Sequence, residues 1–153
     1  MRSRLLKAAP AAGLVPLALL VYSRLKRPVP LGVAYSEATG VDALLVTLRK
    51  EERDFAPSTR YRDYPISAEL FHWETQNSTT LASAPGRRYT EGGSRVLLFV
   101  RAFREDELGS SPYLCLGEVS HVENQGERPI SITWRLHRPM PQDLLSKGLV
   151  EAG

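Results

Sequence analysis

The segment Pro129–His137 contains the pattern that most restricts the fold, because apolar and polar side chains alternate along it. Successive side chains of a strand point to opposite sides, so the alternation predicts a strand with one buried face. Pro139 and Pro141 end it, since proline has no N–H to donate to a sheet. The apolar side consists of Ile130, Ile132, Trp134 and Leu136, and the polar side of Ser131, Thr133, Arg135 and His137. A chain with this segment is expected to build a sheet over a core.

Three other segments have the length and apolar character of strands. Val41–Leu48 and Arg95–Arg101 are short apolar runs with β-branched residues, which predict buried strands. Tyr113–Val122 predicts a further strand, and the turn residues 124–127 that follow predict a hairpin loop. Gln142–Val150 is expected to be a short helix or tail. The predicted class is therefore α+β, mainly β, with a small antiparallel barrel-like sheet and short flanking helices.

The length of 153 residues leaves room for one domain with a core. We place this domain at residues 32–145, between an N-terminal segment (1–31) and a tail (146–153). The single cysteine, Cys115, excludes an intrachain disulfide and lies in an apolar run, where a buried core residue is expected. Low cysteine content suits a reducing compartment, so we expect a cytoplasmic protein.

The N-terminal segment has an apolar run at residues 8–22 with basic residues on both sides, which is the order found in signal peptides. Pro10, Gly13 and Pro16 interrupt this run. It is also shorter than the roughly 20 residues that a membrane-spanning helix needs. We therefore favour a short helix here over an exported or anchored segment or a misassigned start, and we do not expect a membrane partner.

The stretch Ser58–Ser78 is the densest in side chains suited to recognition, with aromatic rings, arginines, amides and hydroxyls. We favour a brief helical turn that begins at Ser67, whose hydroxyl can cap it, followed by a strand. The alternative is a strand over Glu69–Gln76. In that strand His72 would share one face with Leu70, Glu74 and Gln76, and Trp73 would share the other with Phe71 and Thr75.

The polar stretch Asn77–Gly93 is expected to be a long loop, and such a loop in a small domain is often functional. Rings and amides side by side can stack on a nucleic-acid base and hydrogen-bond its edge, while arginines can meet phosphates. The candidate nucleic-acid-binding residues are Arg60, Tyr61, Arg62, His72, Trp73, Gln76, Asn77 and Arg87. The alternative interpretation places Phe71 and Trp73 in the core. In the same interpretation, an arginine forms a salt bridge inside the domain and holds the long loop in place.

Patterns that support enzymatic chemistry are absent from the sequence. There is no glycine-rich phosphate loop, and no serine lies in a nucleophile elbow. One cysteine and three scattered histidines do not have the spacing of a zinc site. We therefore expect a non-enzymatic chain with no catalytic residues, no metal and no cofactor. The net charge of +3 and the pI of about 9.2 favour an anionic partner.

Several runs, in order, carry a family resemblance: STRYRDYPISAELFHWETQNSTT, ASAPGRRY, VLLFVRAFRED, SPYLCLGEVSHV and RPISITWRLHRPMP. The chain resembles an uncharacterised bacterial domain that usually forms the C-terminus of large DEAD/DEAH-type superfamily 2 helicases. Many of those helicases also carry an N-terminal phospholipase-D-like nuclease domain and look like restriction or phage-defence proteins. The resemblance covers roughly residues 32–145 and implies a nucleic-acid context.

The chain departs from that arrangement because the helicase and nuclease parts are absent, so ATP hydrolysis and strand cleavage do not carry over. The apolar N-terminal segment replaces the usual helical lead-in, which suggests a gene fragment, a split protein or a stand-alone module. We expect an accessory domain that contacts DNA, through a base or a modified base, beside a helicase/nuclease chain acting in trans. The alternative is a protein-interaction domain that docks on a helicase core or on itself.

Overall fold

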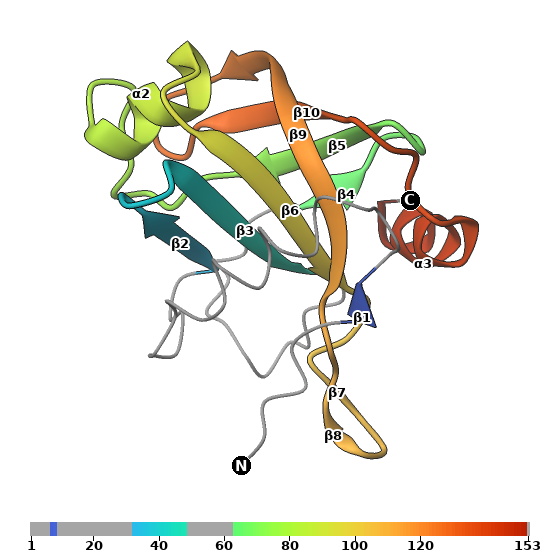
Figure 1. Ribbon diagram of the computed structural model, residues 1–153. Helices are drawn as coiled ribbons and strands as arrows, with labels where there is room; N and C mark the ends of the chain where they lie inside the picture. Colours follow the sequence, from blue (N-terminus) through green and yellow to red (C-terminus); the bar gives the residue numbers. More distant parts are fainter. Residues whose placement is uncertain (1–6, 9–31, 49–62, 153) are drawn as a thin grey trace.

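The computed structural model describes residues 7–8, 32–48 and 63–152, and the account below concerns these residues (Figure 1). The strands are β1 (Lys7–Ala8), β2 (Val33–Ser36), β3 (Val41–Thr47), β4 (Tyr64–Pro65), β5 (Leu70–Glu74), β6 (Arg95–Arg101), β7 (Glu105–Asp106), β8 (Gly109–Ser110), β9 (Leu114–Gln125) and β10 (Ser131–Leu136). The helices are α2 (Ala84–Glu91) and α3 (Gln142–Ala152). The four strands predicted from apolar patterns are confirmed, with small shifts of their ends. Of the two alternatives for the C-terminal segment, a short helix or a tail, the structure has the helix.

The main sheet has the strand order β2-β3-β6-β9-β10-β5-β4, with β1 added beside β9. The predicted class, α+β and mainly β, is confirmed. The sheet differs from an antiparallel barrel in being open and mixed, because β3 and β6 run parallel. After β3 the chain forms β4 and β5 at the opposite edge of the sheet and returns through α2 to pair β6 with β3. Because the chain crosses back before it forms β6, β6 runs in the same direction as β3 and the two strands pair in parallel.

The alternation predicted for the last strand is confirmed. Ile130, Ile132, Trp134 and Leu136 are buried. They join the larger of two apolar clusters, and we call the side of the sheet that faces this cluster the core face. The same face of β5 contributes Phe71 and Trp73, and each lies opposite a residue of β10: Phe71 opposite Trp134, and Trp73 opposite Ile132.

A second, smaller cluster lies on the other side of β3 and β6. It contains Ala34, Val41, Ala43, Leu97, Phe99 and Cys115. Both faces of β3 and β6 are thus covered, which accounts for their continuous apolar sequences. The predicted burial of Cys115 is confirmed, and this burial raises the pKa of its thiol.

The helical turn predicted at Ser67 is wrong, and the residues form a hairpin turn between β4 and β5. The carbonyl oxygen of Leu70 accepts hydrogen bonds from the N–H groups of Ile66 (2.8 Å) and Ser67 (3.2 Å). The Ser67 hydroxyl accepts from the N–H groups of Glu69 and Leu70, both at 3.2 Å. The Ser67 hydroxyl does accept backbone hydrogen bonds, as expected of a cap. It stabilises the turn between two strands and not a helix, because β5 pairs directly with β4.

The long loop predicted over residues 77–93 is also wrong, because α2 occupies half of it. Ser83 is the N-cap, and its Oγ accepts a hydrogen bond from the N–H of Gly86 at 3.2 Å. Pro85 stands in the first turn, where its missing N–H has no cost, and Gly92 ends the helix at φ 78°. The sequence contains these helix signals, but Ser, Pro and Gly also mark turns, so they do not distinguish a short helix from a loop.

Helix α3 lies against the edge strand β4 and close to Leu48, which follows β3. A Cβ atom added to Gly148 would lie 2.5 Å from Pro65 Cγ in β4 and 3.3 Å from Leu48 Cδ1 just after β3. Leu144 and Leu145 of the same helix enter the larger cluster. The helix therefore packs on the core beside the β4 edge of the sheet. It runs across the predicted boundary between the domain and residues 146–153. Neither described helix has the length and apolar character that a membrane span requires.

Candidate nucleic-acid interface

The face of β4, β5, β10 and β9 that points away from the core carries polar and aromatic side chains in register. One row runs from Tyr64 through His72 and Thr133 to Glu123. The neighbouring row runs from Leu70 through Arg135 to Ser120. We call this surface the polar face. Its members used below are Tyr64, His72, Glu118, Ser120, Thr133, Arg135 and His137.

Tyr64 and His72 form a stacked ring pair on the polar face. Their ring centroids are 4.6 Å apart and the ring planes differ by 10°. The register produces this stack, since Tyr64 of β4 lies directly opposite His72 of β5 and paired side chains project to the same side. Both rings are half-buried. An aromatic pair at a sheet surface is the kind of platform on which unpaired bases stack.

A hydrogen-bonded chain of polar groups extends the polar face toward β6. Ser120 Oγ lies 2.6 Å from His137 Nε2, and the backbone N–H of His137 donates to the Glu118 carbonyl oxygen at 3.1 Å. Arg95 Nη2 lies 2.7 Å from Glu118 Oε2. The hydrogen bond from Arg95 and, more weakly, the nearby His137 lower the pKa of Glu118, while this pairing raises the pKa of Arg95. Arg135 is exposed on the same face.

Several of the predicted binding residues lie within the described chain. His72 is on the polar face, as described above. Trp73 is 5% exposed on the core face and packs edge-to-face on Tyr89, with ring centroids 5.3 Å apart. Its burial takes Trp73 out of the candidate interface and supports the alternative in which it is a core residue. Arg60, Tyr61 and Arg62 lie outside the described residues.

The remaining predicted residues lie beyond the end of β5. Gln76 begins a turn in which its carbonyl oxygen accepts from the Thr79 N–H at 2.9 Å, and Asn77 in that turn is exposed. Arg87 is exposed on α2. Sequence reasoning missed Tyr64, Thr133, Arg135 and Ser120 as members of one surface. The alternation in the last strand places Thr133 and Arg135 on the same side, so the sequence indicates two of these four residues as neighbours on one surface.

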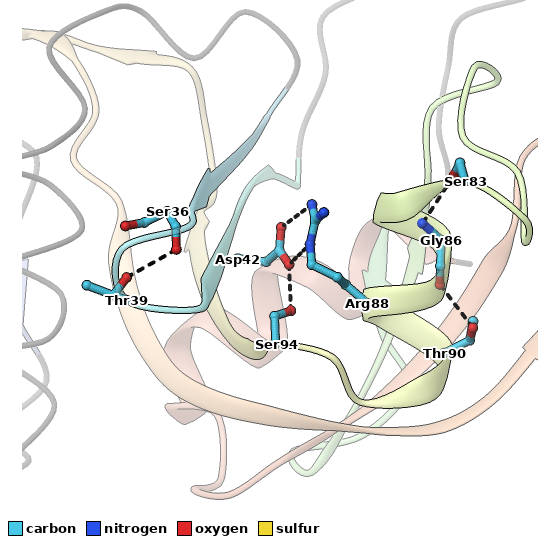
Figure 2. A network of polar contacts seen from close by, with 8 residues as sticks. All are labelled: Ser36, Thr39, Asp42, Ser83, Gly86, Arg88, Thr90 and Ser94. Atoms are coloured by element: carbon cyan, nitrogen blue, oxygen red, sulfur yellow. Dashed lines mark hydrogen bonds and ion pairs between the residues drawn. The ribbon is translucent and has the colours of Figure 1, made fainter.

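Helix α2 is fixed to the sheet by a buried ion pair (Figure 2). The carboxylate of Asp42 on β3 is fully buried and accepts from Arg88 Nε at 2.9 Å and Nη2 at 3.2 Å. The Ser94 hydroxyl donates to the same carboxylate at 2.5 Å. The hydrogen bond to Asp42 raises the pKa of Arg88, whose guanidinium also lies 3.7 Å from the Tyr35 ring centroid.

This pairing answers the question of which arginine holds the segment after β5. The internal salt bridge considered for Arg87 is made by its neighbour Arg88, and Arg87 is left on the outer side of α2. Because the Arg88 donors are engaged by a buried carboxylate, Arg88 is a structural residue. Among the residues that the structure describes, no cluster of His, Cys, Asp and Glu has the arrangement needed to hold a metal ion.

The comparisons with known proteins place the chain in a family without describing an activity. No curated protein matches the sequence. One family model, described as "Domain of unknown function (DUF3427)", matches residues 18–147. The matched residues include the strands from β2 to β10 and helix α2. The chain therefore belongs to the DUF3427 family of domains of unknown function.

Proposed function

We propose that this chain is a non-enzymatic accessory domain that contacts DNA through the polar face of its sheet. The observation that carries the proposal is the Tyr64–His72 stack, with ring planes within 10° of parallel, in register with Thr133 on β10. A stacked pair of this kind offers a flat π surface to a base, and the neighbouring hydroxyl offers a hydrogen-bonding group for the base edge.

An exposed arginine and the net charge of the whole chain support the same partner. Arg135 is exposed beside the ring pair, one row along the sheet, and supplies a guanidinium for a phosphate. The excess of three positive charges over the whole chain favours encounter with a polyanion. Base stacking has little dependence on sequence, so the expected preference is for unpaired strands over duplex, including a flipped or modified base.

The family resemblance supplies the proposed context. The domain is proposed to serve a helicase/nuclease system of the restriction or phage-defence kind, with the motor and nuclease supplied by a separate chain. In that arrangement the polar face holds the strand while the partner chain acts on it. The chemistry of ATP hydrolysis and strand cleavage belongs to the partner.

The proposal is tested by fluorescence anisotropy of labelled single-stranded and double-stranded DNA with the full chain, at low and moderate salt. Binding is expected to be tighter to the single strand and to weaken as salt rises. Replacing both Tyr64 and His72 by alanine is expected to lower the affinity by about tenfold or more. Arg135→Ala is expected to reduce the salt dependence by about one phosphate contact.

Two controls make the result specific. Lys147→Ala removes an exposed cation on α3, away from the polar face, and is expected to leave the affinity within about twofold. Circular dichroism of each variant confirms that the fold is retained. If the Tyr64 and His72 double variant is folded and binds single-stranded DNA as tightly as the original chain, the proposal is wrong.

The second candidate function, protein docking, draws on a different surface. The β7–β8 hairpin and the residues before it expose Phe103 and Leu108 and carry acidic residues, which suit a protein partner better than DNA. Salt separates the two functions, because phosphate contacts weaken steeply as salt rises and apolar contacts do not.

A further inference from the structure

The smaller apolar cluster lies on one face of the sheet, and its buried members all come from the strands themselves. They belong to β2, β3, β6 and β9, and neither of the two described helices contributes a residue to it. Even so, Val41, Ala43 and Leu97 are each at most 1% exposed. An apolar sheet face reaches such burial only when another layer of the chain packs on it.

The strand directions show that the chain crosses the sheet between β1 and β2. β1 pairs with β9 at Leu114 and Cys115, on the side of β9 opposite to β6, while β2 lies at the other edge beside β3 (Figure 1). β1 is parallel to β9, β9 antiparallel to β6, β6 parallel to β3, and β3 antiparallel to β2. β1 and β2 therefore run in the same direction at opposite edges.

Two parallel strands cannot be joined by a tight turn, so the connection has to pass over a face of the sheet. Residues 9–31 form this connection. Four strand spacings separate the two edges by about 19 Å, which a segment of this length spans easily. The core face is already occupied, because Tyr89 of α2 and Leu144 and Leu145 of α3 pack there. The face that is left is the one with the smaller cluster.

Both ends of this connection are fixed at the smaller cluster. At its start, Ala8 lies opposite Cys115, which is a member of the cluster. At its end, the Gly32 carbonyl oxygen accepts a hydrogen bond at 2.7 Å from the N–H of Leu45, which packs against the cluster. Gly32 has a φ of 69°, and a Cβ atom there would lie 2.9 Å from the Leu45 carbonyl oxygen, so only glycine fits this entry into β2.

The sequence of the connection suits an apolar face. Residues 9–22 contain no charged side chain, whereas the segment 49–62 is rich in charged residues. The family match begins at residue 18, inside the apolar run, which indicates that this part of the run belongs to the domain. The largest group of apolar side chains in the run consists of Leu14, Leu17, Leu19 and Leu20.

We propose that the apolar run at residues 9–22 docks on the smaller cluster of the same chain, as the crossover between β1 and β2. Its leucines would contact Ala43, Leu97 and Phe99. The run then serves as the second layer over β3 and β6, and it is not an export signal or a membrane anchor. The inference does not depend on DNA binding.

Site-specific photo-crosslinking in the full chain tests the contact directly. p-Benzoylphenylalanine is placed in turn at positions 17, 19 and 20, which point in different directions around a helix. After irradiation, mass spectrometry is expected to find crosslinks within one chain to β3 or β6 from at least one position. The same probe at Leu108, which is 79% exposed on the hairpin that projects beyond the sheet, is expected to give none. If no position in the run reaches β3 or β6, or if the crosslinks join two molecules, the inference is wrong.

The single cysteine provides a second readout, because Cys115 is a buried member of the cluster. Replacing Leu19 and Leu20 together by serine is expected to raise the rate at which a thiol reagent modifies Cys115 by about tenfold or more. Phe55→Ser, in the charged segment 49–62, is expected to leave this rate within about twofold. The opposite result would assign the cover to residues 49–62 and overturn the inference. Circular dichroism shows whether each variant keeps its sheet, and the crosslinking result decides the question for a variant that does not.

Discussion

Asp42 and Arg88 lie 46 positions apart and form a buried ion pair with two hydrogen bonds that joins β3 to α2. Asp42 is completely buried, while the Arg88 side chain is 18% exposed. Removing one partner of such a pair leaves an uncompensated buried charge, which is more destabilising than losing the pair as a whole.

Arg88→Ala is therefore expected to lower the free energy of unfolding by about 3 kcal/mol, near the lower end for buried pairs because the arginine is partly exposed. Arg87→Ala removes the neighbouring, exposed cation and is expected to change it by less than about 0.5 kcal/mol. Urea unfolding of both variants measures the difference. Equal effects would mean that the ion pair does not hold α2.

Gly86→Ala is expected to destabilise the protein, although alanine usually stabilises a helix by about 1 kcal/mol relative to glycine. A Cβ atom at position 86 would overlap with the carbonyl oxygen of Thr80, a backbone atom that cannot move by a rotamer change. The expected loss is about 1–3 kcal/mol, as for other overpacked sites.

Gly93→Ala is the matched substitution for this test. Its added Cβ would lie 3.4 Å from the nearest atoms, both of Arg88, and the expected change is below about 0.5 kcal/mol. Thermal unfolding of the two variants compares them. A Gly86→Ala variant that is more stable than the original chain would show that the turn before α2 is looser than the structure indicates.

Trp73 and His72 are adjacent, but substitutions at Trp73 are expected to lower stability and substitutions at His72 to lower DNA affinity. Trp73→Phe leaves a void in the core and is expected to lower the free energy of unfolding by about 1–3 kcal/mol, with unchanged affinity for single-stranded DNA. His72→Ala removes half of the ring stack, so it is expected to lower that affinity by about fivefold or more. Its effect on stability is expected to be below about 1 kcal/mol. Denaturant unfolding and anisotropy on both variants check this, and a loss of affinity in Trp73→Phe alone would reverse the assignment of the two faces.

The Glu118–Arg95 pair predicts a small dependence of stability on pH. The pKa of Glu118 is lowered in the folded state. The stabilisation is therefore present above the ordinary glutamate pKa of about 4.3 and is lost as the pH falls through the lower folded-state pKa. Since Arg95 is 53% exposed, the contribution is expected to be at most about 1 kcal/mol. Glu118→Gln should be less stable than the original chain at neutral pH and equal to it in acid. Urea unfolding at both pH values measures this, with Glu123→Gln on the same strand as the control.

For β5, the alternation in the sequence determined which residues share a face but not which face meets the core. In β5, the grouping of Phe71 with Trp73 and of Leu70 with His72 follows from the period of two alone. Trp73 is buried because Tyr89 and Trp134, from elements far along the chain, pack against it. His72 becomes part of a candidate interface because β4 places Tyr64 beside it. Both outcomes depend on tertiary contacts.

The sequence by itself therefore determined the mainly β class, the main strands and the polar side of β10, because these depend on local periodicity. Tertiary structure alone decided that β3 pairs with β6 in parallel, because that pairing depends on where the intervening chain crosses the sheet. It also decided that Asp42 faces Arg88, since no local pattern links residues 46 positions apart. The signals for α2 were local, but Ser, Pro and Gly also mark turns, and packing of Tyr89 into the core accompanies the helical outcome.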